Sequence, residues 1–353
     1  MPKGAVGLDI GTSAVRAAEI AGRKEPAILT RFAQIALPAG AVIDGEIAQP
    51  DVVTSKIKEL WRRGGFRIKR VAIGVANQKV VVRQVDLPFM EEDELRGALQ
   101  FQAQEYIPIP IEDAILDFQV LEEFPAEGGE RMMRVLLVAA QRDMINTFVT
   151  VVQDAGLDPI LIDVTPFAAL RPLIDRAPSV MEEREGEAVV DIGGGVTTIV
   201  VHEGGAPRFV RTLPAGGSEI TDALVGSLGI PLEDAEGVKA RVGLAPEGTA
   251  APVEGAGKII EDRATAFMDE VRGSLDYYQG QPGAVRVARV KLTGGGARLP
   301  NLTQRLAAVL RLPVEEAQPL AHVKLGKLGL SPEQLVQMSA VAAVAVGLSM
   351  GDT

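Results

Sequence analysis

Two segments far apart in the chain each place an aspartate, an apolar residue and a glycine at the end of an apolar run. They are Leu8-Asp9-Ile10-Gly11-Thr12-Ser13 and Val190-Asp191-Ile192-Gly193-Gly194-Gly195. A second apolar run follows each turn, which predicts two β-hairpins of one design. Glycine lets backbone N–H groups approach phosphate oxygens, and one carboxylate from each hairpin suits a hydrated Mg²⁺. The repeat therefore predicts a phosphate clamp formed by two halves of the chain.

A third glycine cluster, Gly294-Gly295-Gly296, lies between an expected strand over 287–293 and an expected helix over 300–310. Bare backbone in that position can receive a nucleotide base or its α-phosphate. The chain contains no G-x-x-x-x-G-K-[ST] segment and no G-x-G-x-x-G after a strand, so a Walker-type P-loop is excluded and a dinucleotide site is disfavoured. We expect Asp9 and Asp191 to hold Mg²⁺ through water, and the nucleotide contacts to come from Asp9, Gly11, Thr12, Ser13, Asp191, Gly193, Gly194, Gly195, Thr197, Thr198, Gly294, Gly295, Gly296 and Arg298.

Composition excludes several other kinds of site. The 353 residues include no cysteine and only two histidines, His202 and His322, so disulfides, thiol catalysis and Cys-ligated metals are excluded. The formal net charge of −11 argues against nucleic acids and against an anionic membrane surface as partners. No signal peptide is recognisable, and the apolar run over 340–348 is far shorter than the roughly 20 residues of a membrane span. We therefore expect a cytoplasmic protein in which this run is a buried helix whose small residues allow close packing.

Strand and helix patterns alternate along the chain, except over 80–156. There the expected order is strand, helix, strand, strand, helix, with polar Gly128-Gly129 between the last two strands. This stretch is long enough for a small α+β subdomain inserted into the first half of an α/β protein.

The paired hairpins and the glycine turn resemble the actin-like ATPase superfamily, in which two similar α/β lobes enclose a nucleotide cleft. Within it, residues 217–224 and 233–239 resemble the segment of FtsA that leads to the nucleoside-contacting helix. By that resemblance Glu236 and Lys239 contact the nucleoside. The alternative interpretation is an i,i+3 surface ion pair.

Four further segments resemble the PilM family of type IV pilus assembly proteins. They are Gln104-Glu105-Tyr106-Ile107-Pro108-Ile109-Pro110, Leu116-Asp117-Phe118, Ile162-Asp163-Val164-Thr165-Pro166-Phe167-Ala168 and Ser274-Leu275-Asp276-Tyr277-Tyr278. The resemblance implies an FtsA-type insert and capture of the N-terminal cytoplasmic peptide of a PilN-like inner-membrane protein between the first lobe and that insert. It also implies recruitment to the inner face of the cytoplasmic membrane through that partner, in a pilus or a related type II secretion system. Tyr106, Ile107, Pro108 and Phe118 are the expected groove walls, unless they fill the core of the insert.

The resemblance also implies a division of the chain into lobes. The first lobe would comprise 1–79, 157–185 and 332–353, the insert 80–156, the second lobe 186–230 and 285–331, and a second-lobe subdomain 231–284.

Hydrolysing relatives place a Gln, Glu or Asp near the γ-phosphate, and one such position is just before the proline that opens a helix. Here that position is Thr165, which is a poor base, and Asp163 is the weak alternative candidate. We therefore expect tight binding of ATP or ADP with slow or absent turnover. The alternatives are a filament-forming protein like FtsA or MreB, a sugar kinase on the same fold, and a scaffold that binds no nucleotide; self-association is possible.

Overall fold

The first of two large sheets carries the N-terminal hairpin. The structure is a computed structural model that describes residues 4–22, 26–126, 128–174, 185–246 and 255–351. The first sheet has the strand order β10-β6-β1-β2-β3-β16. Its strands are β10 (Asp158–Val164), β6 (Arg70–Val75), β1 (Val6–Ile10), β2 (Ala14–Ala21), β3 (Ile28–Ala36) and β16 (Lys324–Leu325). The elements around it are β4 (Val42–Ile43) and β5 (Glu46–Ile47), which pair with each other, and the helices α1 (Pro50–Gly64), α3 (Arg142–Asp154), α4 (Thr165–Leu170), η3 (Arg171–Leu173), α9 (Pro332–Val341) and α10 (Ala343–Ser349).

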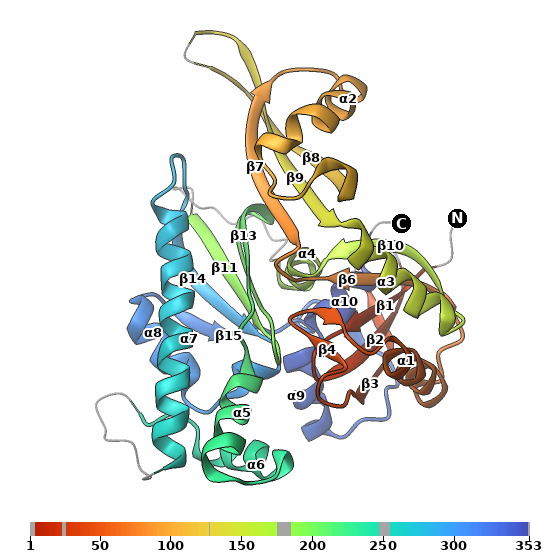
Figure 1. The fold of residues 1–353 in the computed structure, drawn as a ribbon, viewed down its shortest axis with the longest axis vertical. Coiled ribbons are helices and arrows are strands. Elements are labelled where there is room, and N and C mark those ends of the chain that lie inside the picture. Colours follow the sequence, from red (N-terminus) through yellow and green to blue (C-terminus); the bar gives the residue numbers. More distant parts are fainter. Residues whose placement is uncertain (1–3, 23–25, 127, 175–184, 247–254, 352–353) are drawn as a thin grey trace.

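The second sheet repeats the plan of the first. Its order is β13 (Ala206–Leu213), β12 (Thr197–Glu203), β11 (Glu185–Ile192), β14 (Arg286–Thr293) and β15 (Val314–Glu316). Both sheets contain an antiparallel hairpin, β1-β2 in the first and β11-β12 in the second. On its other edge, the first strand of each hairpin pairs in parallel with a further strand, β6 in the first sheet and β14 in the second. The turns also match, since Gly11 N–H donates to Ala14 O at 3.1 Å and Gly193 N–H donates to Val196 O at 2.9 Å. The predicted repeat and two-lobed α/β architecture are confirmed, and the lobes lie side by side (Figure 1).

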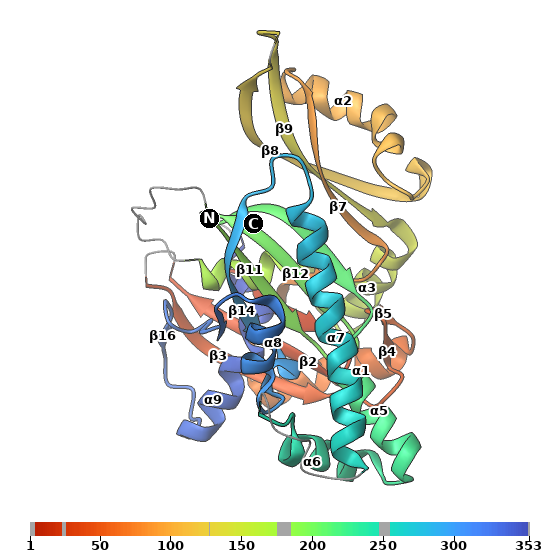
Figure 2. The same cartoon turned by 90° about the vertical axis from the view of Figure 1, so that its left-hand side faces the viewer.

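Four helices and one short 3₁₀ turn complete the second lobe: α5 (Gly217–Leu228), α6 (Leu232–Val242), α7 (Ala256–Gln279), α8 (Leu302–Leu310) and η4 (Gly295–Arg298). The long helix α7 runs along the second sheet (Figure 2) and buries Met268, Val271 and Leu275 in the same core as the strands. The expected subdomain 231–284 therefore shares its core with the second sheet in the part of the chain that the structure describes.

The insert forms a third sheet that stands away from the two lobes (Figure 1). Its order is β7 (Val80–Pro88), β9 (Arg131–Gln141) and β8 (Ala114–Pro125). Helix α2 (Glu92–Gln102) contributes Leu95 and Leu99 to a core with one face of this sheet, and the 3₁₀ helices η1 (Ala103–Glu105) and η2 (Ile111–Asp113) lead into β8.

Two expected boundaries differ from the structure. Helix α3 was expected in the insert, but Phe148 and Val151 pack in the first-lobe core with Ile57, so the insert sheet ends at Gln141. The second lobe was expected to continue to residue 331, but β16 pairs with β3, and Val323 packs with first-lobe residues. Tertiary packing decides both boundaries. Hydrophobic periodicity predicts whether a segment is a helix or a strand, but not which other element it packs against.

The apolar run near the C-terminus is a buried helix, as predicted. Two glycines allow its backbone to touch its neighbours: a Cβ on Gly347 would lie 1.7 Å from Ala168 O of α4, and a Cβ on Gly7 would lie 2.0 Å from Ala345 O. Helix α10 is thereby packed directly on β1, the strand that carries Asp9.

One expected groove residue lies in the core of the insert. Ile107 is only 4% exposed and packs in the same cluster as Leu99 and Leu137. Tyr106 and Phe118 are half-buried and Pro108 is exposed. The core interpretation therefore holds for Ile107, because its aliphatic side chain follows the buried stripe of α2 into the sheet.

Truncating Ile107 should destabilise the protein, because deleting a buried aliphatic side chain leaves a cavity. We expect Ile107→Ala to cost about 2–4 kcal/mol in the unfolding transition that reports the insert, measured in urea. Phe101, on α2 and 83% exposed, is the matched control, and Phe101→Ala should change that transition by less than about 0.5 kcal/mol. Equal effects of the two substitutions would contradict this placement of Ile107.

Candidate functional site

The two glycine hairpins meet at a cleft between the lobes. Gly195 N–H donates a hydrogen bond of 3.3 Å to Thr12 Oγ1, so the tips of the hairpins are in direct contact. Beside them lies a cavity of about 100 Å³. Its walls come from both lobes and comprise Asp9, Gly11, Thr12, Ser13, Arg16, Gly45, Ala76, Thr165, Asp191, Gly193, Gly194, Val196, Thr198, Thr293, Gly294, Gly295, Val341, Ala343 and Val344.

The two aspartates line this cavity and influence each other electrostatically. Asp9 lies near the end of β1 and Asp191 near the end of β11, at matching positions of the two hairpins. Burial and then the negative charge of Asp9 raise the pKa of Asp191 to about 7, against a smaller opposing effect of Arg16. Burial likewise raises the pKa of Asp9, although Arg16 opposes this. The Asp191 carboxylate is thus poorly compensated within the protein, whereas Asp9 is partly compensated by its ion pair with Arg16.

Arg16 was not among the predicted site residues. It lies on β2 directly opposite Asp9, and its Nη1 contacts Asp9 Oδ2 at 3.2 Å. Its Nε is buried without a hydrogen-bond partner. A guanidinium donor in a phosphate cleft is a natural anion ligand. The signal available in the sequence was the hairpin register, which places a basic residue across from Asp9 on the same face.

The third glycine turn closes the cavity from the second lobe. Gly294 has φ +90°, and a Cβ there would lie 2.5 Å from Asp191 Oδ1, so only glycine fits without strain. Gly294 N–H donates to Ala340 O of α9 at 2.8 Å. This turn therefore connects the second lobe to the C-terminal helices and brings bare backbone next to the aspartates.

Some predicted residues lie beside the cavity or point away from it. Thr197 is fully buried and its hydroxyl donates to Ala215 O at 2.8 Å, whereas the adjacent Thr198 lines the cavity. Arg298 is exposed and is not among the lining residues, and neither are Gly195 and Gly296. Alternation along β12 explains the two threonines, since successive side chains point to opposite faces of a sheet.

Glu236 and Lys239 form the expected i,i+3 pair, at 2.8 Å, but they also contact α5. Lys239 Nζ donates to Gly217 O at 3.1 Å and to Thr221 Oγ1 at 2.6 Å. Gly217 lies next to the glycine turn, because a Cβ on it would be 3.5 Å from Gly296 Cα. The pair is therefore built into the second lobe close to the third glycine cluster.

The weak catalytic candidate Asp163 is engaged elsewhere. Its carboxylate forms an ion pair with Arg171 and accepts a hydrogen bond of 2.7 Å from Val164 N–H. Among the described residues that line the cavity, the acidic ones are Asp9 and Asp191 alone. The site thus offers cation ligands but no separate carboxylate to activate water.

The cleft has the donor set of a Mg²⁺–nucleotide site. The glycine backbones, the buried guanidinium of Arg16 and the hydroxyl of Thr198 suit phosphate oxygens. The described residues contain no group of three or more His, Asp or Glu side chains that could hold a metal ion on its own. Two carboxylates acting together with phosphate oxygens and water match the usual protein contribution to Mg²⁺ binding.

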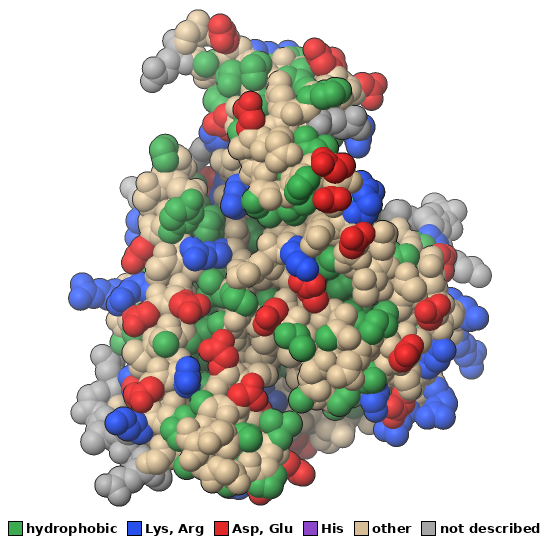
Figure 3. Space-filling view, in the orientation of Figure 1, with side chains coloured by type: hydrophobic (Ala, Val, Ile, Leu, Met, Phe, Trp, Pro, Cys, Tyr) green, Lys and Arg blue, Asp and Glu red, His purple; other side chains and the backbone are tan. Residues whose placement is uncertain are grey.

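The outer surface carries charged side chains of both signs. On the face drawn in Figure 3, acidic and basic side chains are interspersed. Among the described residues, no helix is sufficiently long and apolar to span a bilayer.

Comparisons with known proteins support this fold. A solved structure, the PilM-PilN type IV pilus biogenesis complex, superposes with a TM-score of 0.84 at 30% identity, covering 99% of this chain and 98% of that one. MreB5 of Spiroplasma citri, bound to AMPPNP, shares the actin-like fold with a TM-score of 0.56 at 14% identity, covering 98% and 95%. The cell division protein FtsA of Neisseria meningitidis serogroup B is 28% identical over 61% of this chain. The match spans 56% of the length of that FtsA.

The family described as type IV pilus assembly protein PilM matches residues 7–353. With its two lobes, its insert and its paired glycine hairpins, this chain belongs to the PilM family.

Proposed function

We propose that this chain is a cytoplasmic, nucleotide-dependent adaptor of the type IV pilus machinery. ATP or ADP with Mg²⁺ would bind in the cleft, and a PilN-like inner-membrane protein would be the partner that recruits the chain to the membrane. The observation that carries the proposal is the pair of matched hairpins, which bring Asp9 and Asp191 to one cavity together with Arg16. The nucleotide-bound relative MreB5 and the PilM-PilN complex support it by similarity.

Each part of the site has a defined task in this proposal. Asp9 and Asp191 hold Mg²⁺ through water, and the ion neutralises phosphate charge. Backbone N–H groups of the hairpin turns and the Thr198 hydroxyl donate to phosphate oxygens, while Arg16 supplies a positive charge. Glu236 and Lys239 lie where the nucleoside would approach the third glycine turn. Turnover is slow or absent, because no further carboxylate among the described lining residues is available as a base.

The peptide site is proposed at the junction of the insert with the first lobe. Arg142, the first residue of α3, donates to Ala114 O at 2.7 Å and so ties the start of β8 to the first lobe. The preceding segment between η1 and η2 exposes Pro108 and leaves Tyr106 half-buried. Proline keeps this stretch extended, which favours contact with an extended peptide. Ile107 supports the segment from inside the core and is not proposed as a contact.

Two adjacent threonines offer a matched test of the nucleotide site. Thr198→Val should weaken Mg²⁺–ATP binding about three- to tenfold, because a hydroxyl donor to phosphate is lost. Thr197→Val should leave that affinity unchanged and instead lower stability, since Ala215 O loses its partner. Asp9→Ala should weaken binding more than tenfold. Calorimetric titration with ATP measures all three, and wild-type affinity in both Asp9→Ala and Thr198→Val would contradict the site.

The peptide site is tested with a synthetic peptide that copies the N-terminus of a PilN protein from the same organism. We expect Tyr106→Ala and Pro108→Asp each to weaken its binding at least tenfold. Pro108→Asp should change Tm by less than about 2 °C because Pro108 is exposed, whereas Tyr106→Ala should also lower Tm because Tyr106 packs partly against the insert core. Glu130→Ala, at the exposed turn between β8 and β9, is the control. Fluorescence anisotropy reports the affinity. Wild-type peptide affinity in a chain that carries both Tyr106→Ala and Pro108→Asp would show that the peptide binds elsewhere.

A further inference from the structure

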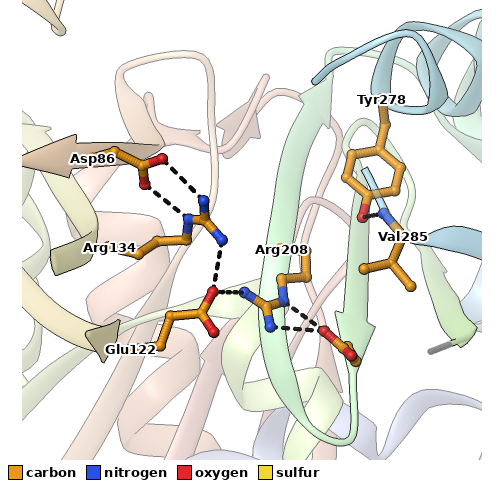
Figure 4. Close-up of polar contacts among 7 residues, drawn as sticks. Asp86, Glu122, Arg134, Arg208, Tyr278 and Val285 are labelled. Atoms are coloured by element: carbon orange, nitrogen blue, oxygen red, sulfur yellow. Dashed lines mark hydrogen bonds and ion pairs between the residues drawn. The ribbon is translucent and has the colours of Figure 1, made fainter. Parts of the chain in front are cut away.

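A chain of ion pairs joins the insert to the second lobe. The polypeptide backbone does not connect the insert to the second lobe at this point. Arg208 on β13 contacts Glu122 on β8, with 3.3 Å between Nη1 and Oε1 (Figure 4). The same Glu122 oxygen accepts from Arg134 Nη1 of β9 at 2.6 Å. Arg134 in turn makes two hydrogen bonds, of 2.8 and 2.9 Å, to Asp86 of β7. On its own lobe, Arg208 is held by Glu203 at 2.7 Å.

The Arg208–Glu122 ion pair, called the bridge below, is held in place by its neighbours and by partial burial. The side chain of Arg208 is only 14% exposed, and those of Arg134 and Glu122 are 24% and 30% exposed. A register irregularity between Val120 and Glu122 of β8 sets Glu122 opposite Arg134 in the sheet. Burial alone would raise the pKa of Glu122, but the hydrogen bonds and charges of Arg134 and Arg208 lower it. Such partly buried, shared pairs are screened less than ordinary surface ion pairs.

The bridge lies beside a large cavity between the two bodies. This cavity, of about 490 Å³, is bounded by β7 of the insert and by β13 and the end of α7 in the second lobe. β7 and β13 are edge strands of their sheets. The two sheets share no strand pairing, and beside the bridge Val82 and Leu136 of the insert and Val210 of β13 belong to one apolar cluster. The bridge is the polar part of this contact, and neither sheet depends on it for its own strand pairing.

The insert is covalently part of the first lobe only. β7 follows β6 of the first sheet, and β9 leads directly into α3, which packs in the first-lobe core. Any movement that separates the lobes therefore pulls Arg208 away from Glu122, unless the insert turns to follow the second lobe.

The size of the cleft cavity favours such a movement on nucleotide entry. The cleft cavity measures about 100 Å³, whereas ligand pockets usually measure about 300–1,000 Å³. The tips of the two hairpins are also in contact, since Gly195 N–H donates to Thr12 Oγ1. Separation of the two hairpin tips thus opens the cleft, and it stretches the bridge whenever the insert stays with the first lobe.

We propose that the Arg208–Glu122 bridge is a latch that couples the opening of the nucleotide cleft to the orientation of the insert. With the latch closed, the insert and the second lobe move as one body; with it broken, the insert reorients on the first lobe. This inference rests on the proposed nucleotide and peptide sites, since it assigns the route by which occupation of one site changes the affinity of the other.

Whether the bridge fixes the insert against the second lobe can be measured without nucleotide by two spin labels, and the absence of cysteine from the chain makes their attachment specific. Glu94→Cys on α2 and Thr265→Cys on α7 are exposed positions for two spin labels. Double electron–electron resonance should give one narrow distance distribution between the two labels in the otherwise unchanged chain. Arg208→Gln or Glu122→Gln should broaden or shift it, and the double variant should resemble either single variant because both break the same contact.

The control is the next residue along β8. Glu123 pairs at 2.6 Å with Arg131, entirely within the insert, so Glu123→Gln should leave the distances unchanged. Identical distributions in Arg208→Gln, Glu122→Gln and Glu123→Gln would overturn the latch.

Calorimetric titration with ATP tests whether the bridge affects nucleotide affinity. If opening breaks the bridge, Arg208→Gln and Glu122→Gln should bind ATP about two- to fivefold more tightly than wild type, and Glu123→Gln should match wild type. Unchanged affinity in all variants would show that the bridge does not oppose cleft opening. Failure of wild type to bind ATP would refute the proposed function, and the label distances would still decide whether the bridge fixes the insert.

Discussion

Desolvation of two partly buried carboxylates at the interface of the lobes, together with the repulsion of Asp191 by Asp9, is the constraint on which the site depends. Asp9 and Asp191 lie on two separate sheets, and Arg16 partly offsets their charge. Because the folded pKa of Asp191, about 7, lies above its ordinary value of 3.8, its neutral form stabilises the fold at low pH. That contribution is complete below about pH 4, declines between pH 4 and 7, and is lost above pH 7. A bound cation would relieve the repulsion, so the site exchanges some stability for ligand affinity.

The rest of the molecule holds these two groups at a controlled distance. Each aspartate extends from a buried strand whose hairpin is braced by a parallel neighbour, β6 or β14. Helix α10 touches β1 backbone to backbone at Gly7, and α9 receives the N–H of Gly294. The insert extends this frame outward, and its bridge to β13 ties a distant surface to the same opening motion.

Local patterns predicted the parts of the fold and site that depend on neighbouring residues. The hairpins, the third glycine turn and the buried helix near the C-terminus are all set by apolar runs, glycines and small residues, and they were found where expected. The PilM assignment came from short segments in the insert and the lobes, and the family match supports it.

What sequence could not supply was the choice of tertiary neighbours. Thr197 and Thr198 are adjacent residues of the same type, and the sequence does not say which of them faces the cavity. The strand register in the structure decides this. Ile107 looked suitable for a groove wall until its packing with Leu99 placed it in the core. Asp163 lost its candidate role because Arg171, eight residues later, folds back onto it. Arg16 was detectable in principle, but only by reading the hairpin register as a cross-strand pair.

Proton release on ligand binding tests the central claim most directly. Calorimetric titration of Mg²⁺–ATP in buffers of different ionisation enthalpy counts the protons released per ligand bound. With the pKa of Asp191 about 7, that group should release about half a proton on binding at pH 7, more at pH 6 and almost none above pH 8.5. Asp191→Asn should remove most of this release. Binding enthalpies that are independent of the buffer from pH 6 to 8.5 would show that the carboxylate pair is not the cation site.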